Sequence, residues 1–177
     1  MNITYRIPKF SELDKVSEQI HNSYTFTYKG LMEEEYLSSL HTNHWVPILQ
    51  ECMDKGDCCL VAEIDDKIVG STVFGIISEE KTIFAEWHAF YLLPQYIGHG
   101  IGHSFYQRIE NEMRAQGSEF CILEVLSSNM RAIRFYQSHG FVKTESLVVE
   151  ENGMTLSCEK MKADLHDLKV KSKDTER

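Results

Sequence analysis

A glycine-rich turn is the feature that most limits how this chain can fold. Residues 92–102 read LLPQYIGHGIG, in which Gly98, Gly100 and Gly102 alternate with larger residues. The turn joins an apolar run stopped by Pro94 to an amphipathic helical pattern, so it predicts a strand–turn–helix unit. Such a unit directs free backbone N–H groups and the positive end of a helix dipole at one point. Because glycine lets an anion approach the backbone closely, the turn predicts a cradle for phosphates.

The spacing of this turn excludes two common phosphate-binding patterns. Gly102-His103-Ser104 lacks the lysine that a Walker sequence places before its Ser or Thr. The alternating glycines also fail to match the G-x-G-x-x-G fingerprint of dinucleotide-binding folds. On these residues alone, a tight strand–helix turn that binds nothing remains the alternative.

Hydrophobic periodicity predicts one mixed α/β (α+β) domain over residues 1–163. A short strand is expected at 3–7, followed by a helix that Ser11 caps. The charged, aperiodic segment 164–177 is expected to be a disordered tail. The other expected elements are helices at 33–40 and 45–53, strands at 58–64, 67–77 and 82–93, a helix from 101 that ends at Gly117, a strand at 120–126, a helix at 129–138, and strands at 141–150 and 154–161.

The composition excludes several classes of function. A net charge of −9 argues against nucleic-acid binding and weakly favours a cationic substrate. No apolar run is long enough to cross a membrane, and the N-terminus lacks the apolar core of a signal peptide. The cysteines show neither zinc spacing nor a C-x-x-C pair, and His99 and His103 have no third ligand nearby. We therefore expect a soluble cytoplasmic protein without a metal site.

Two motifs carry a resemblance to a known family. Gln95-x-x-Gly98-x-Gly100 resembles the Q/R-x-x-G-x-G/A segment of the GNAT superfamily, the Gcn5-related N-acetyltransferases. The preceding run, residues 90–94, is similar to the end of that family's fourth strand. About 25 residues later, Asn129-x-x-Ala-Ile-x-Phe-Tyr-x-x-x-Gly-Phe resembles its second landmark. The resemblance covers roughly residues 58–161.

This resemblance implies a fold and a cofactor. The fold would be one domain with a mostly antiparallel central sheet, splayed between its fourth and fifth strands and flanked by helices. Acetyl-CoA would be the co-substrate, with its pyrophosphate on the glycine turn and its pantetheine arm paired like an added strand with the end of the fourth strand. For Asn129, a plain helix cap is the alternative. The residues expected to bind the cofactor are Leu92, Leu93, Ile97, Gly98, His99, Gly100, Ile101, Gly102 and Asn129.

The resemblance also suggests catalytic residues. Tyr136 occupies a position where the family often has a general acid, which would protonate the leaving thiolate. Its alternative role is that of a core aromatic residue. Glu86 lies where many relatives carry a carboxylate that takes the proton of the amine, directly or through water. His88 shares the strand face of Glu86, and either His88 or water is an alternative base.

The acceptor is the least defined part of the prediction. By resemblance, the segment around residues 24–40 covers the acceptor side, where Tyr24, Phe26 and Tyr28 would contact a cationic substrate. We expect acetyl transfer to a primary amine of a small molecule, by direct attack in a ternary complex. A protein or peptide amine, or a non-catalytic sensor of acyl-CoA, remains an alternative. A homodimer is compatible with the family, many members of which dimerise.

Overall fold

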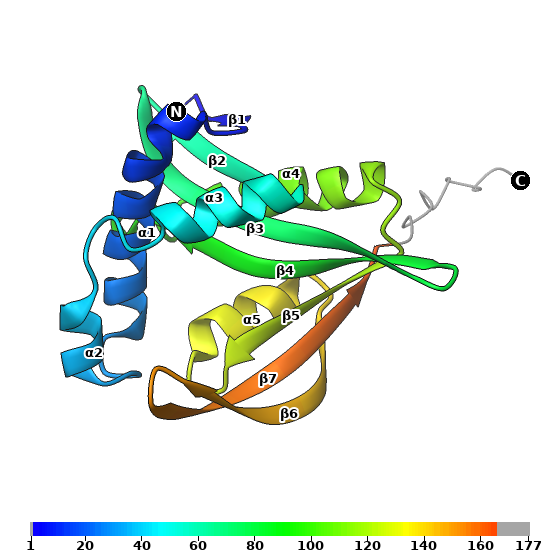
Figure 1. Ribbon diagram of the computed structural model, residues 1–177. Helices are drawn as coiled ribbons and strands as arrows, with labels where there is room; N and C mark the ends of the chain where they lie inside the picture. The colour runs from blue at the N-terminus through cyan, green and yellow to red at the C-terminus, as the bar shows by residue number, and fades with distance from the viewer. Residues whose placement is uncertain (1, 166–177) are drawn as a thin grey trace, which may run out of the picture.

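The fold is organised around a seven-stranded sheet with the order β1-β2-β3-β4-β5-β7-β6 (Figure 1). The structure is a computed structural model in which residues 2–165 are described. All neighbouring strands are antiparallel except β4 and β5, which are parallel. The strands are β1 (Thr4–Arg6), β2 (Cys58–Ile64), β3 (Lys67–Glu79), β4 (Thr82–Leu92), β5 (Phe120–Leu126), β6 (Val142–Glu151) and β7 (Met154–Asp164).

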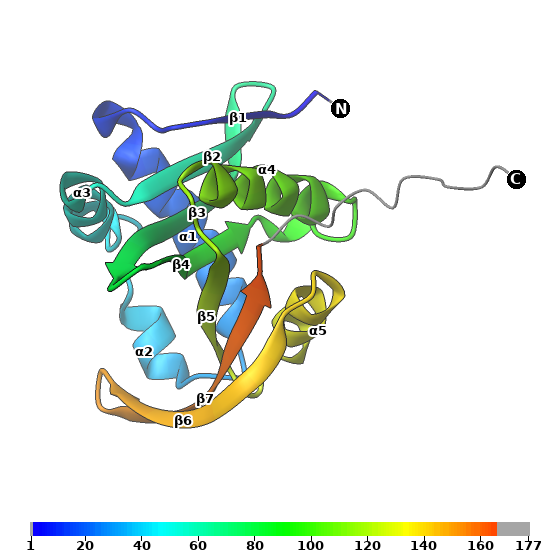
Figure 2. The same ribbon diagram turned by 90° about the vertical axis from the view of Figure 1, so that its right-hand side faces the viewer.

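Helices cover both faces of this sheet. Because side chains alternate along a strand, neighbouring residues of β2 enter different cores. Val61 packs in the core beneath α1 and α3, whereas Leu60 and Ala62 pack in the core beneath α4 and α5. Figure 2 shows α4 and α5 on the side of the sheet away from α1. The helices are α1 (Leu13–Tyr28), α2 (Glu34–Ser39), α3 (Val46–Lys55), α4 (Ile101–Ala115) and α5 (Met130–Ser138).

The sheet opens between β4 and β5, as the family resemblance implies. The two strands pair only from Phe84–Trp87 of β4 to Phe120–Leu123 of β5. At the end of this pairing β4 carries a bulge. Trp87 and Ala89 lie opposite two consecutive residues of β3, so His88 between them has no partner residue in the register of β3 and β4. A bulge bends its strand and stops the ladder. The strands therefore separate beyond Trp87, and Figure 1 shows them diverging toward α5.

The start of the first helix differs from the prediction. Ser11 lies inside a short 3₁₀ turn, Phe10–Glu12, and Glu12 is the residue before α1. The Glu12 carboxylate accepts hydrogen bonds from the Arg6 guanidinium and from the amide of Lys9, at 2.8 Å each. The Arg6 contact is the main reason that the pKa of Glu12 falls to about 2. This ion pair, which joins β1 to the helix start, is not visible in local sequence patterns.

The structure also defines the end of α1 and extends β7 beyond its expected end. The helix α1 includes the aromatic segment and ends at Tyr28. Asp164 still belongs to β7, and the amide of Leu165 donates to the carbonyl of Glu119 at 2.8 Å. The tail expected from residue 164 therefore begins later, and its remaining part, 166–177, lies outside the described residues. Within residues 2–165, no helix is long and apolar enough to cross a membrane.

Candidate active site

A pocket of about 450 Å³ lies where β4 and β5 separate. Its walls come from the free part of β4, the glycine turn, the end of β5, the helix α5 and the last turn of α1. From His88 to Leu92, β4 pairs with β3 alone, so its other edge faces the pocket with unpaired backbone groups. This edge can pair with an extended ligand, as an added strand would.

The glycine turn presents free donors to the pocket. Gly98 and Gly100 both have positive φ angles, 85° and 78°, and Gly100 is the N-cap of α4. In the described part of the chain, the amides from Gly98 to Gly102 donate to no other group. A Cβ on Gly98 or Gly100 would meet nothing within 4 Å, so the space in front of these amides is open. The turn therefore has the donors and the room for a pyrophosphate.

Six of the nine residues expected to bind the cofactor line the pocket: Leu92, Ile97, Gly98, Gly100, Gly102 and Asn129. The other three do not line it with their side chains. Leu93 is buried, its amide donates to the carbonyl of Val69, and its carbonyl accepts from Tyr96, so its backbone is already paired. The side chain of Ile101 is buried in the core, so only its backbone amide is available to a ligand at the glycine turn. His99 is exposed at the turn.

Asn129 combines the two roles considered for it. Its Oδ1 accepts a hydrogen bond from the amide of Ala132 at 3.2 Å, which caps α5. The same residue is buried and borders the pocket. Among the described residues, its Nδ2 group has no partner, and it is available to a bound ligand.

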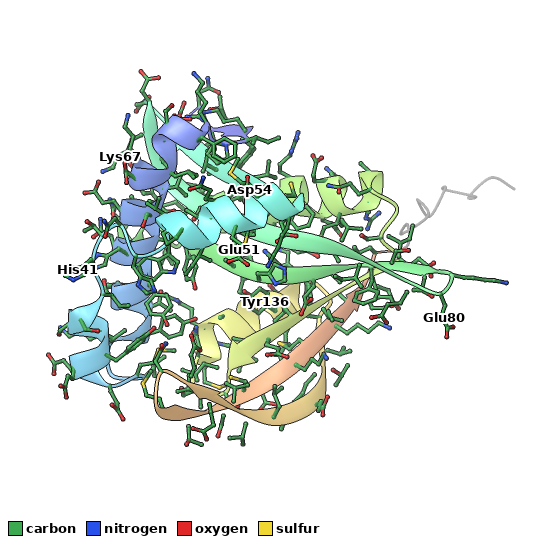
Figure 3. All side chains as sticks on the ribbon, in the orientation of Figure 1. His41, Glu51, Asp54, Lys67, Glu80 and Tyr136 are labelled. Atoms are coloured by element: carbon green, nitrogen blue, oxygen red, sulfur yellow. The ribbon has the colours of Figure 1, made fainter. Side chains whose placement is uncertain are left out.

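Tyr136 also has the features of both roles considered for it, a general acid and a core aromatic residue. Its ring lies against Trp87 and Phe141, with centroids 5.5 and 5.6 Å away. It nevertheless lines the pocket, and Figure 3 shows it between α5 and β4. Burial, with smaller contributions from Tyr28 and Cys121, raises the pKa of its hydroxyl well above the usual range. The hydroxyl therefore keeps its proton at neutral pH.

Glu86 and His88 lie together at the closed end of the opening. Both line a second cavity of about 180 Å³, on which Glu124 and Lys160 also border. His88 and Glu124 line the main pocket too, whereas Glu86 does not. His88 and Glu124 thus stand between Glu86 and the space where a substrate would react.

A missing side chain on β3 makes room for His88. A Cβ on Gly75 would lie 2.9 Å from Oδ1 of Asp57 and 3.2 Å from Nε2 of His88. Contacts below 3.4 Å are tighter than ordinary packing, so the absence of a side chain at Gly75 leaves room for both Asp57 and His88. Asp57 and His88 thus both approach Gly75, and Glu86 borders the same second cavity as His88.

The three aromatic residues expected at the acceptor side have different environments. Tyr28 lines the pocket, and the Tyr91 hydroxyl partly offsets the effect of burial on the pKa of the Tyr28 hydroxyl. Burial is the main cause of the raised pKa of both hydroxyls. Tyr24 lies behind them, its ring 4.5 Å from that of Tyr28. Phe26 is 53% exposed and lies outside the pocket, where the Arg131 guanidinium stacks on its ring at 5.8 Å.

Several pocket residues escaped the sequence analysis. Glu124 is the only charged residue of the apolar run FCILEVL, and that isolation was a usable signal. Tyr91 and Arg131 carried no comparable mark. His139 escaped because its partner, His103, is 36 residues away and on another helix. His103 is hydrogen-bonded to His139 and to Gln107. Across residues 2–165, no cluster of three or more His, Cys, Asp or Glu side chains could hold a metal ion.

Comparison with known proteins gives one family. The model of the acetyltransferase (GNAT) family matches residues 18–141. A protein of Archaeoglobus fulgidus named as an uncharacterized N-acetyltransferase is 31% identical over 127 residues, which cover 70% of this chain and 84% of that protein. The spermidine N(1)-acetyltransferase of Thermoplasma acidophilum is 26% identical over 147 residues, or 80% of this chain and 89% of that one.

Solved structures agree with this match. The PaiA N-acetyltransferase of Thermoplasma acidophilum, in complex with coenzyme A, superimposes with a TM-score of 0.72. It is 25% identical, and the match covers 93% of this chain and 99% of the other. YncA of Salmonella typhimurium, with acetyl-CoA, has the same fold, with a TM-score of 0.68 and 20% identity over 93% of this chain and 95% of the other.

Proposed function

The chain belongs to the acetyltransferase (GNAT) family and is an acetyl-CoA-dependent N-acetyltransferase, and from this premise we propose that its acceptor is a primary amine of a small aliphatic polyamine. The amine attacks the thioester directly in a ternary complex. The observation that carries the choice of a small acceptor is the closed acceptor side, where α2 and the β6–β7 hairpin touch.

This contact is both polar and apolar. Asn152, at the tip of the hairpin, donates a hydrogen bond to the Tyr36 hydroxyl at 3.1 Å. Beneath it, Leu126, Met154 and Leu156 pack against the end of α1 and the start of α2. A peptide needs an open groove in which its chain can lie extended, whereas a short amine needs only a narrow entrance. The closure therefore favours the small molecule.

The negative charge at the end of the pocket where the amine would react favours a cationic acceptor with more than one amine. Glu124 is the one carboxylate among the described residues that line the pocket. The aromatic faces of Tyr28, Tyr91 and Tyr136 lie on the same lining, and aromatic rings attract cations. The relative from Thermoplasma acidophilum that is named as a spermidine N(1)-acetyltransferase supports the same class.

The roles of the chain's residues follow from their positions. The amides from Gly98 to Gly102 hold the pyrophosphate, and the free edge of β4 orients the extended arm. When bound, acetyl-CoA supplies the electrophilic thioester carbon. Glu86 takes the proton of the acceptor, directly or through water, with His88 as the alternative base beside it. Tyr136 gives its proton to the departing thiolate, so that the proton count balances.

An amine panel tests this proposal. Release of free thiol from acetyl-CoA is measured with polyamines, with monoamines of matched length and with short peptides. A polyamine should exceed the matched monoamine by about tenfold in kcat/KM, because a second ammonium group can pair with Glu124. Glu124→Gln should remove most of that difference and leave the monoamine rate nearly unchanged. A peptide that reacts faster than every polyamine would contradict the proposed acceptor class.

A further inference from the structure

Two histidines form a hydrogen-bonded pair at the outer end of the pocket. His103 lies in the first turn of α4, and His139 follows the last residue of α5. Nδ1 of His103 and Nε2 of His139 are 2.8 Å apart, and both residues line the pocket. This end is opposite the reaction end, where Glu124 and Trp87 border both cavities.

The hydrogen bonds define which nitrogens carry protons. Nδ1 of His139 is 2.8 Å from the carbonyl oxygen of Phe135, which can only accept, so this nitrogen donates. In a neutral ring, Nε2 of His139 is then an acceptor, and Nδ1 of His103 must donate to it. Nε2 of His103 is left as an acceptor, 3.1 Å from the amide nitrogen of Gln107. The neutral pair therefore offers its one free lone pair to the exposed Gln107 amide.

One added proton changes Nε2 of His103 from a hydrogen-bond acceptor to a donor. A protonated His139 donates through Nε2 to His103, and Nε2 of His103 then becomes an N–H donor that an anion can accept in place of the exposed Gln107 amide. The positive charge is favoured at His139, which stands at the C-terminal end of α5 and bonds a helix carbonyl. A second proton would place two N–H groups against each other across the 2.8 Å contact. The pair can thus accept one positive charge but not two.

The surroundings of the pair suit an anion. The Tyr106 ring of α4 lies 4.2 Å from the ring of His139, and the Phe135 ring of α5 lies 4.4 Å from it. Ser138 Oγ is 3.2 Å from Nδ1 of His139. Arg131, the charged residue of α5 that lines the pocket, lies at the other end of this helix, with its guanidinium over the Phe26 ring. Of the pocket-lining residues that the structure describes, the sole carboxylate is Glu124, at the other end.

The path of the cofactor leads to this pair. With the pyrophosphate on the amides of Gly98 to Gly102 and the acyl arm along β4, we expect the nucleotide end on the side of the turn away from the β4–β5 opening, where His103 follows Gly102. We propose that the His103–His139 pair binds the 3′-phosphate of coenzyme A and takes up one proton from solution when it does so. A phosphate monoester is the group that gains most, because its second negative charge pairs with the imidazolium. This inference rests on the proposed placement of the pyrophosphate.

Calorimetry of coenzyme A binding tests the proposal without turnover. Titrations in buffers of different ionisation enthalpy, from about pH 6 to about pH 8, give both the affinity and the protons taken up. A dianion favours the protonated pair, so the affinity should fall about tenfold across this range as the pair loses its proton. Near the top of the range, binding should take up close to one proton. With 3′-dephospho-coenzyme A, both effects should disappear.

Variants provide the matched controls. The double variant His103→Gln/His139→Gln should bind coenzyme A with the weak affinity of the dephosphorylated ligand, independently of pH. His41→Gln removes an exposed histidine far from α4 and α5, as Figure 3 shows, and should keep the wild-type pH dependence. If the double variant does not fold, the comparison of the two ligands on the unmodified protein still decides.

Two results would overturn the inference: equal proton uptake with both ligands, or an unchanged pH dependence in the folded double variant. Failure of the proposed function looks different. If Gly100→Asp binds coenzyme A as tightly as the unmodified protein does, the placement of the pyrophosphate is wrong. If that variant loses binding while the proton linkage is absent from the unmodified protein, only the role of the histidine pair is wrong.

Discussion

Tyr136 lies in a packed aromatic cluster and at the edge of the pocket at once. Tyr136→Phe separates these roles, because the ring stays and only the hydroxyl is lost. We expect kcat to fall by about 10²-fold, the usual contribution of a general acid, while the affinity for acetyl-CoA and the melting temperature change little. Steady-state kinetics and calorimetry measure the two effects. Equal kcat values in the two proteins would make Tyr136 a packing residue only.

The identity of the base is decided by comparing Glu86→Gln with His88→Gln. The variant that lacks the base should lose kcat/KM near neutral pH and partly recover it at high pH, where the free amine no longer needs a base. Because His88 borders the main pocket and Glu86 borders only the second cavity, the two variants are matched probes of one proton path. Profiles of pH against rate that superimpose on the original for Glu86→Gln would exclude Glu86 as the base.

At the scale of the element, the start of α1 depends on an ion pair. The Arg6 guanidinium holds the pKa of Glu12 at about 2, against an ordinary value of 4.5. A carboxyl group whose pKa is lower in the folded state stabilises the fold above its unfolded pKa, and this contribution is lost as the pH falls from about 4.5 toward about 2. Glu12→Gln should therefore lower the urea midpoint at neutral pH and have little effect near pH 2. Urea titrations at both pH values measure this, and an equal loss at both would contradict the ion pair.

Local sequence patterns predicted the elements but not the contacts between them. The stripe Ile101, Phe105, Ile109 and Met113 was enough to predict α4, because all four face one core. The bulge at His88 has no comparable mark, since it depends on how β4 registers against β3. The Glu12–Arg6 pair likewise joins two elements, at a helix start that lies past Ser11. Register and ion pairs between elements are tertiary properties, which periodicity does not contain.

At the scale of the whole molecule, the pocket is assembled from both ends of the chain. The last turn of α1 brings Tyr28 to Tyr91 of β4, while α5 brings Asn129 and Tyr136 from the other side. The motifs of the family resemblance marked the glycine turn and α5, and six of the nine expected cofactor residues do line the pocket. The closure between Tyr36 and Asn152 joins residues 116 positions apart, beyond the reach of any local pattern.

That closure has a testable consequence for the acceptor. Tyr36→Phe removes the hydroxyl that accepts from Asn152 and keeps the ring that packs on the hairpin. If the contact narrows the entrance, the variant should raise KM for a polyamine several-fold with little change in its affinity for acetyl-CoA, because a loosened wall orients a short amine less well. Peptide acetylation assayed in parallel should stay low. A variant that keeps the original KM for the polyamine would show that this contact does not shape the acceptor site.

The central claim is that the glycine turn holds the cofactor's pyrophosphate, and one pair of variants tests it most directly. Gly100 has a φ of 78°, a conformation that Asn and Asp tolerate better than other residues with side chains, and open space lies before it. Gly100→Asp and Gly100→Asn therefore differ mainly by one negative charge. Isothermal titration with acetyl-CoA should show a loss of at least about 100-fold in affinity for Asp and a much smaller loss for Asn. Equal affinities in the two variants would contradict the account.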